Sequence, residues 1–174
     1  KLLDILEEDG LSNDIAYNTV LKVWKGSSHP DAQARATAIM KRMEDRKIAN
    51  TISYTTLVGV LANKGDVASA KRANEILEHM QRSYEEGNVS IKPNIQTYNS
   101  VINAWQRCGD VKRAEQLLCQ LEELYKGCGG DLAPNVVSYS TVMNGYTRSQ
   151  DDDAIQKTEE IFRRMQAAYE AGNE

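Results

Sequence analysis

A motif centred on a tyrosine occurs four times in the 174-residue chain, and no other feature constrains the fold as strongly. In each copy an Asn lies four residues before the Tyr, a small residue directly precedes the Tyr, and a small polar residue follows it. Two apolar residues come at the third and fourth positions after the Tyr. The tyrosines, spaced by 37, 44 and 41 residues, are Tyr17, Tyr54, Tyr98 and Tyr139. Such repetition predicts a row of similar structural units.

Each motif is expected to open a helix, here named helix A. In the third copy the apolar residues Tyr98, Val101, Ile102 and Trp105 follow the spacing of one helix face. Asn is a favoured N-cap, and a preceding proline, as in the third and fourth copies, keeps the entering chain extended. The pattern predicts helix A over residues 14–26, 51–64, 95–108 and 136–148.

A second apolar block follows each helix A and predicts a helix B. The blocks begin at Ala36, Ala73, Ala114 and Thr158. Asp66 and Asp110 stand where helix B starts in the second and third copies, and an aspartate there caps the helix and favours its positive end. The run 151–153, Asp-Asp-Asp, is expected to act in the same way in the fourth copy. Each unit is therefore a helical hairpin.

One hairpin cannot bury the apolar faces of both its helices, whereas stacked hairpins can. The expected fold is all-α, a right-handed α-solenoid of stacked antiparallel helical hairpins, with nine helices and no strands. We expect the array to be cut at both ends. The expected units are a trailing helix B over 1–12 and repeats over 13–49, 50–93, 94–134 and 135–174.

Composition excludes several classes of function. There is no run of about 18 apolar residues, so no membrane span is expected. Cys108, Cys119 and Cys128 have neither a disulfide nor a zinc spacing, and no metal, cofactor or small-molecule substrate is expected. The signatures of a zinc deaminase and of a Gly-rich phosphate loop are absent, which argues against an enzyme. The net charge of −4 by itself disfavours nucleic acid.

The repeated residues resemble the pentatricopeptide repeat family. The resemblance rests on Pro-Asn-(Ile/Val)-x-(Ser/Thr)-Tyr-(Asn/Ser)-(Ser/Thr)-Val, followed by Gly-Asp-Val and a helix ending in a paired apolar block and Met. It covers essentially the whole chain and is closest over residues 92–121. The tetratricopeptide family shares the architecture but has a different helix A signature. Relative to the family's regular period, we expect about three extra residues between the helices of repeats one, two and four, and about six at the end of helix B in repeats two and three.

The resemblance implies binding of single-stranded RNA in a mitochondrion or chloroplast, with roughly one base read per repeat. It implies that the residue after each Tyr acts with the residue that the family counts as the last of the repeat, which is the Asn at the start of the next unit as bounded above. The implied base-recognition residues are Asn18 with Asn50, Thr55 with Asn94, Asn99 with Asn135, and Ser140, whose partner falls beyond the chain end. The implied preference, read 5′ to 3′, is pyrimidine, adenine, pyrimidine, purine. That the Asn residues act only as N-caps stays an open alternative.

The resemblance also implies a side chain that wedges beside each base, two residues before the Tyr. These residues are Ile15, Ile52, Gln96 and Val137, of which Gln96 is atypical. The family's helix A lines the RNA groove, and the helix A segments here sum to +4 while the rest of the chain sums to −8. A basic residue near the end of each helix A is expected to contact phosphate, or to complement the negative helix end. These residues are Lys25, Lys64, Arg107 and Arg148.

Two functions follow as expectations. The first is an RNA-binding adaptor in organellar RNA processing, stability or translation. The second is a protein-binding scaffold, for example a structural subunit of an organellar ribosome or another large assembly, with other proteins as partners. The intact recognition-type residues favour the first, and the mild groove charge and irregular period favour the second.

Overall fold

The computed structural model describes residues 13–128 and 130–172. These residues form eight α-helices and two short 3-10 helices, and they contain no strand. The predicted trailing helix over 1–12 lies outside the described residues. The A helices are α2 (Asp14–Lys25), α4 (Thr51–Lys64), α6 (Ile95–Arg107) and α8 (Val136–Tyr146). The B helices are α3 (Ala32–Asp45), α5 (Val67–Glu85), α7 (Val111–Cys128) and α9 (Ala154–Glu170).

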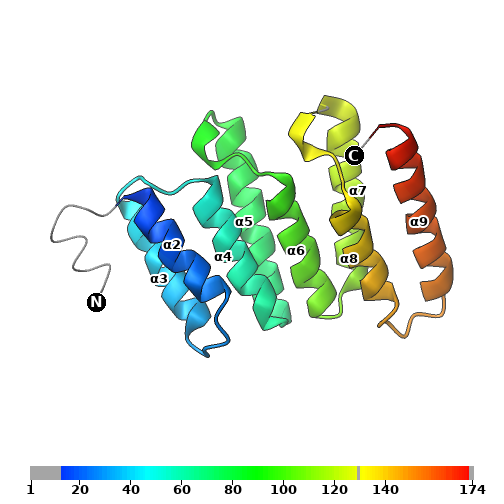
Figure 1. The fold of residues 1–174 in the computed structure, drawn as a ribbon, viewed down its shortest axis with the longest axis horizontal. Helices are drawn as coiled ribbons and strands as arrows, with labels where there is room; N and C mark the ends of the chain where they lie inside the picture. Colours follow the sequence, from blue (N-terminus) through cyan, green and yellow to red (C-terminus); the bar gives the residue numbers. More distant parts are fainter. Residues whose placement is uncertain (1–12, 129, 173–174) are drawn as a thin grey trace.

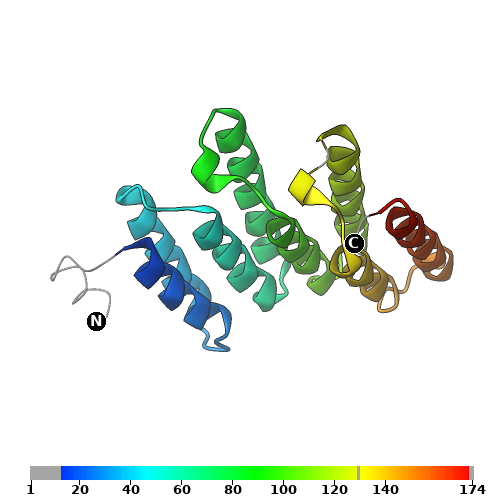
Figure 2. The same cartoon turned by 45° about the horizontal axis from the view of Figure 1, so that its top comes forward.

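The hairpins stand side by side in one row (Figure 1). Each A helix packs against the next A helix, and α3, α5 and α7 each pack against both their own A helix and the next one. The A helices therefore form a continuous layer, with the B helices in a second layer behind it (Figure 2). This arrangement confirms the predicted all-α solenoid of antiparallel hairpins.

The marker tyrosines are the centre of this packing. Tyr17, Tyr54, Tyr98 and Tyr139 are at most 5% exposed. Seven residues after each of them stand Trp24, Leu61, Trp105 and Tyr146, of which the last three are buried and Trp24 is partly buried. Burial of these large side chains drives the stacking, because each large apolar side chain contributes about 1.5–3 kcal/mol when removed from water.

Every A helix begins at the predicted Asn. The side chains of Asn13, Asn50, Asn94 and Asn135 each accept a hydrogen bond from a backbone N–H of the first turn. In α4, α6 and α8 the third helical residue returns the contact and completes a capping box. These residues are Ser53, Thr97 and Ser138, all fully buried.

The expectation for the B-helix caps holds for two of the aspartates. Asp66 accepts from the Ser69 N–H at 2.7 Å, and Asp110 accepts from the Arg113 N–H at 3.2 Å. Asp153 is the N-cap residue of α9, but its side chain makes no capping hydrogen bond. The prediction of a side-chain cap in the run 151–153 is therefore wrong for Asp153.

The three extra residues expected between the helices of repeat two are not there, whereas the extra length expected at the end of its helix B is present. Only Gly65 and Asp66 separate α4 from α5, and Gly65 takes a left-handed φ of 72° that suits a tight turn. The extra residues lengthen α5 to 19 residues, against 14 for α3, and form the 3-10 helix η1 (Val89–Ile91). In repeat three, α7 has 18 residues and is followed by η2 (Gly130–Leu132), as expected. The longer connections lie at 26–31 and 147–153.

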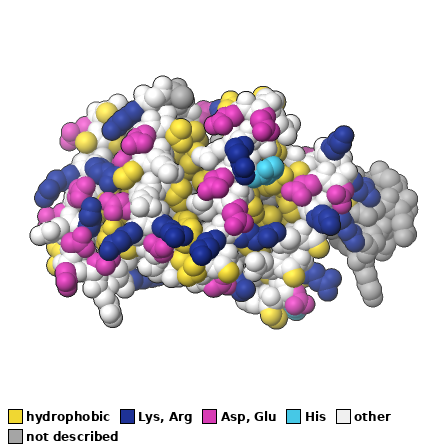
Figure 3. All heavy atoms as spheres, turned by 180° about the vertical axis from the view of Figure 1, so that it is seen from behind, with side chains coloured by type: hydrophobic (Ala, Val, Ile, Leu, Met, Phe, Trp, Pro, Cys, Tyr) yellow, Lys and Arg dark blue, Asp and Glu magenta, His cyan; other side chains and the backbone are white. Residues whose placement is uncertain are grey.

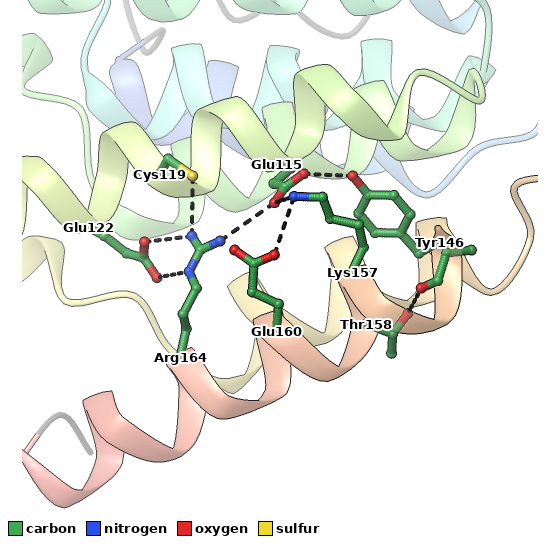
Figure 4. Close-up of polar contacts among 9 residues, drawn as sticks. Glu115, Cys119, Glu122, Tyr146, Lys157, Thr158, Glu160 and Arg164 are labelled. Atoms are coloured by element: carbon green, nitrogen blue, oxygen red, sulfur yellow. Dashed lines mark hydrogen bonds and ion pairs between the residues drawn. The ribbon is translucent and has the colours of Figure 1, made fainter. Parts of the chain in front are cut away.

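A polar network joins the last two B helices (Figure 4). Arg164 on α9 donates to Glu122 on α7 at 2.6 Å and to the Cys119 sulfur at 3.2 Å. Glu115 on α7 accepts from the Tyr146 hydroxyl at 2.6 Å and from Lys157 on α9 at 3.5 Å. Burial and the neighbouring Glu115 raise the pKa of Tyr146. These contacts hold repeat four against repeat three.

Candidate nucleic-acid interface

The predicted base-recognition residues gather at the N-terminal ends of the A helices. Asn18, Thr55, Asn99 and Ser140 are each the fifth residue of an A helix. Their predicted partners Asn50, Asn94 and Asn135 are the N-caps of the following A helix. Because each A helix packs on the next, the two members of a pair meet across a repeat boundary.

The structure brings all three predicted pairs together. Asn18 Nδ2 donates to Asn50 Oδ1 at 3.4 Å, and Asn99 Nδ2 donates to Asn135 Oδ1 at 3.2 Å. Thr55 reaches Asn94 indirectly. The hydroxyls of Thr55 and Thr97 are 2.7 Å apart, and Thr97 Oγ1 donates to Asn94 Oδ1 at 3.0 Å. No feature of the sequence alone pointed to this connecting role of Thr97.

The recognition residues are not equally accessible. Asn18 and Thr55 are only 5% and 7% exposed, whereas Asn99 and Ser140 are partly exposed. Asn18 Oδ1 is buried and has no hydrogen-bond partner in the part of the chain that the structure describes. A buried acceptor without a partner costs about 1–3 kcal/mol, so the pair of repeat one is less well satisfied than the pair of repeat three.

The predicted wedge residues stand next to these pairs, at the second position of each A helix. Ile15, Ile52 and Val137 are 68%, 52% and 55% exposed, and Gln96 is also exposed. Three branched apolar side chains thus face solvent at the same helix position in three of the four described hairpins. Their flat sides could stack against planar rings, and Gln96 interrupts the series.

The predicted phosphate contacts lie at the other end of the A helices, and all four are exposed. Lys64, Arg107 and Arg148 line one polar hollow of about 660 Å³ across the ends of α4, α6 and α8. Its other polar side chains are Asn103, Gln106, Thr141 and Asn144. Lys25 lies apart from this hollow, with its aliphatic chain across Gly59, where an added Cβ would be 2.6 Å from Lys25 Cε.

Two of these cations already contact the protein. Arg107 donates to the Asn63 carbonyl oxygen at 3.2 Å, in the last turn of α4, and therefore complements that helix end. Lys64 pairs with Asp66 at 3.2 Å. The contact of Arg107 with the end of α4 therefore supports the interpretation that this cation complements a helix end. A contact of Arg107 with phosphate would come in addition to this one.

The opposite face of the described residues mixes both signs of charge. Seen from behind, Lys and Arg alternate with Asp and Glu between seams of apolar side chains (Figure 3). One pocket is lined by residues of α5 and α7 and by Trp105 of α6. Trp105 Nε1 donates to Asn74 Oδ1 at 3.5 Å, and the Arg113 guanidinium lies over the Trp105 ring at 4.6 Å from its centroid. Acidic and basic side chains are therefore intermixed on this face (Figure 3).

Neither a metal site nor a membrane segment is found within residues 13–128 and 130–172. These residues hold no group of three His, Cys, Asp or Glu side chains that could bind a metal ion. No helix among them is both long enough and apolar enough to cross a bilayer.

A row of helical hairpins with one continuous layer of first helices defines an α-solenoid repeat protein. The model of the pentatricopeptide repeat domain matches residues 38–107, and that of the PPR repeat family matches residues 93–148. The chain belongs to the pentatricopeptide repeat family, as its residues predicted.

Known proteins agree with this assignment. A pentatricopeptide repeat-containing protein of Arabidopsis thaliana is 31% identical over 101 residues, which are 58% of this chain and 16% of that protein. The solved structure of PPR10 in complex with an 18-nt psaJ RNA element matches with a TM-score of 0.73 at 21% identity, over 99% of this chain and 22% of that chain. The chain therefore spans less than a quarter of the length of either protein.

A second solved structure has a length closer to that of this chain. The PPR domain of Arabidopsis thaliana protein-only RNase P 1 in complex with tRNA matches with a TM-score of 0.69 at 19% identity, over 95% of this chain and 78% of that chain. At these identities the two solved structures show a shared fold.

Proposed function

We propose that this chain binds single-stranded RNA along the N-terminal ends of its A helices, reading about one base per repeat, as an adaptor in organellar RNA processing, stability or translation. It would bind RNA without catalysing a reaction on it. The observation that carries the proposal is the pairing of recognition-type side chains across three successive repeat boundaries, beside a series of exposed wedge residues.

The side chains in the pairs suit the edges of bases. Amides both donate and accept hydrogen bonds, and hydroxyls do either, so each pair can complement a base edge. The two solved complexes described above, one with an RNA element and one with tRNA, support this choice of ligand. The proposed preference is pyrimidine, adenine, pyrimidine, purine for repeats one to four.

Base and backbone contacts would be separated along each A helix. The cation lies seven to nine residues beyond the recognition residue, which is roughly 10–14 Å at 1.5 Å per helical residue. We assign Lys64, Arg107 and Arg148, at the polar hollow, and Lys25 to contacts with the RNA backbone. Such contacts position the strand without reading its sequence.

A specific observation favours the alternative, a protein-binding scaffold. Lys64 and Arg107 already contact protein groups, and Asn18 and Thr55 are largely buried. The helix B side offers apolar seams among mixed charges, which suits protein partners (Figure 3).

The decisive experiment is selection of RNA by the full-length protein from a random single-stranded pool. We expect enrichment of a short motif that contains adenine between two pyrimidines. Absence of binding in low salt, together with recovery of the protein in one defined protein assembly, would establish the scaffold function instead.

A further inference from the structure

Two buried hydroxyls lie at the centre of the recognition pairs. Thr97 Oγ1 is 2.7 Å from Thr55 Oγ1 and 3.0 Å from Asn94 Oδ1. Ser138 Oγ donates to Asn99 Oδ1 at 2.7 Å and lies 3.3 Å from Asn135 Oδ1. Both side chains are 0% exposed, so neither can itself reach a base.

Capping explains only part of these contacts. Thr97 and Ser138 belong to the capping boxes of α6 and α8, which accounts for their contacts with Asn94 and Asn135. It does not require any contact with Thr55 or Asn99, which belong to the preceding repeat. The second set of contacts orients the recognition residue.

The hydroxyl hydrogens of Thr55 and Thr97 decide what the pair of repeat two can offer to a base. The 2.7 Å contact between the two threonine hydroxyls allows either oxygen to be the donor. When Thr97 gives its single hydroxyl hydrogen to Asn94 Oδ1, Thr55 donates its own hydrogen to Thr97. The Thr55 oxygen then keeps only acceptor capacity. Asn94 Nδ2 has no partner among the described residues and keeps both of its donors. This pair therefore presents an acceptor beside a donor.

The pair of repeat three is fixed differently. Asn99 Oδ1 accepts from Ser138, and Asn99 Nδ2 donates one hydrogen to Asn135 Oδ1. The remaining hydrogen of Asn99 Nδ2 and both hydrogens of Asn135 Nδ2 have no acceptor in the described part of the chain. This Asn–Asn pair therefore presents mainly donors.

In repeat one the pair is again Asn with Asn, but its hydrogen bonds differ from those of the pair in repeat three. The Ser53 hydroxyl donates to the Asn50 backbone oxygen at 2.7 Å, and within the described residues it makes no hydrogen bond with Asn18. Asn50 Nδ2 donates to Asp14 Oδ2 at 3.0 Å, and Asn18 Oδ1 is left without a partner in that same part of the chain. Here the oxygen left without a partner in the Asn–Asn pair is an acceptor, and it is buried.

We infer that Thr97 and Ser138 are positioning residues that set which hydrogen-bonding groups Thr55 and Asn99 present to a base, so that the Asn–Asn pairs of repeats one and three are not equivalent. The inference rests on the proposed function. It adds one residue to the reading sites of repeats two and three, at the third position of the following A helix.

Ser53 provides the matched control. In the full-length protein, Ser138→Ala and Ser53→Ala each remove one capping-box hydroxyl and should lower the melting temperature to a similar extent. Only Ser138→Ala releases the amide of a recognition residue. We expect selection from a random single-stranded RNA pool to lose about three- to tenfold of its base preference at the nucleotide of repeat three, the worth of one hydrogen bond. Ser53→Ala should leave the nucleotide of repeat one unchanged.

Conservative variants complete the design. Ser138→Thr keeps the hydroxyl and should retain the base preference at repeat three. At repeat two, Thr97→Val removes the hydroxyl and should weaken the preference, whereas Thr97→Ser keeps the hydroxyl and should not. If both variants still bind RNA, two results would overturn the inference. One is an unchanged base preference at repeat three in Ser138→Ala, and the other is an equal loss of preference at repeat one in Ser53→Ala. Absence of RNA binding by the unmodified protein would instead overturn the proposed function, and with it this inference.

Discussion

At the scale of single residues, the partners of a side chain decide what it can offer a ligand. Asn18 and Asn99 are the same residue at the same helical position, yet the first keeps a buried acceptor without a partner among the described residues and the second has its acceptor filled by Ser138. A code based on two residue identities would treat them alike. The third residue of the next helix A separates them.

Repeat two gives the sharpest test at this scale, because Thr55 with Asn94 is the complete pair that differs from Asn–Asn. Replacing Thr55 by Asn should move the preference at that nucleotide from adenine toward pyrimidine, by about 1–2 kcal/mol if one base-edge hydrogen bond is exchanged. Thr and Asn have similar helix propensities, and Asn stands at the equivalent position in repeats one and three, so the cost in fold stability comes mainly from the lost contact between Thr55 and Thr97. Competitive binding of RNAs that differ at this one nucleotide measures the effect.

Thr56→Asn, one position further along α4, serves as the control for the added amide. It should leave the base preference as it is. RNA binding by Thr55→Asn with adenine still preferred would contradict the assignment of Thr55.

At the scale of helices, the sequence predicted most of what the structure contains. Period, Asn caps and buried tyrosines fixed the A helices, because local capping and one apolar face determine a helix that packs on a neighbour. Three extra residues of repeat two were placed between its helices because the interval from Tyr54 to the apolar block at Ala73 was counted, although Asp66 already marked the start of helix B and so put these residues inside it. A cap fixes where a helix starts, whereas an apolar block can be shifted by one turn and still match.

The two kinds of aspartate at B-helix starts lead to a prediction. Asp66→Ala should destabilise the protein by about 1 kcal/mol, the usual worth of a side-chain cap, and Asp153→Ala should cost much less because it removes no capping hydrogen bond. The Ser69 N–H lowers the pKa of Asp66. Its contribution is therefore present at neutral pH and disappears as the pH falls through that lowered pKa.

Urea unfolding of both variants at neutral pH measures this difference. Repeating it in acid should bring Asp66→Ala and the unmodified protein closer together. Equal destabilisation by the two substitutions at neutral pH would refute the distinction between the caps.

At the scale of the whole molecule, charge is divided between two layers of helices. The A-helix segments carry an excess of +4 in a chain of net −4, and three of their terminal cations share one hollow. The sequence predicted each cation but could not show that they converge, because convergence depends on how neighbouring A helices pack. Nor could it show that Arg107 already binds the end of α4.

Replacing Lys25, Lys64, Arg107 and Arg148 together by Gln should weaken RNA binding whatever the sequence of the RNA. The dependence of log K on log salt should flatten by about 0.7 for each phosphate that is no longer neutralised. Arg107 is expected to contribute least, since it is engaged by the Asn63 carbonyl. Binding measured over a range of salt concentrations gives the slope.

The charge-matched control replaces four exposed cations of the B helices, namely Lys41, Arg72, Lys112 and Arg163. It has the same effect on net charge and should leave the slope nearly unchanged. An identical slope in both variants would assign the four A-helix cations to helix ends alone.

The hydrogen bonds across repeat boundaries also determine how such an array can be cut and rejoined. A segment running from Asn50 to Pro93 carries Thr55 but leaves behind Asn94 and Thr97, on which Thr55 depends. Moving that segment into another array would transplant half of a reading site. The transferable module instead runs from residue 50 to residue 97, from the start of one capping box to the end of the next, so that the wedge residue, the recognition residue, its partner and the buried hydroxyl between them are moved together.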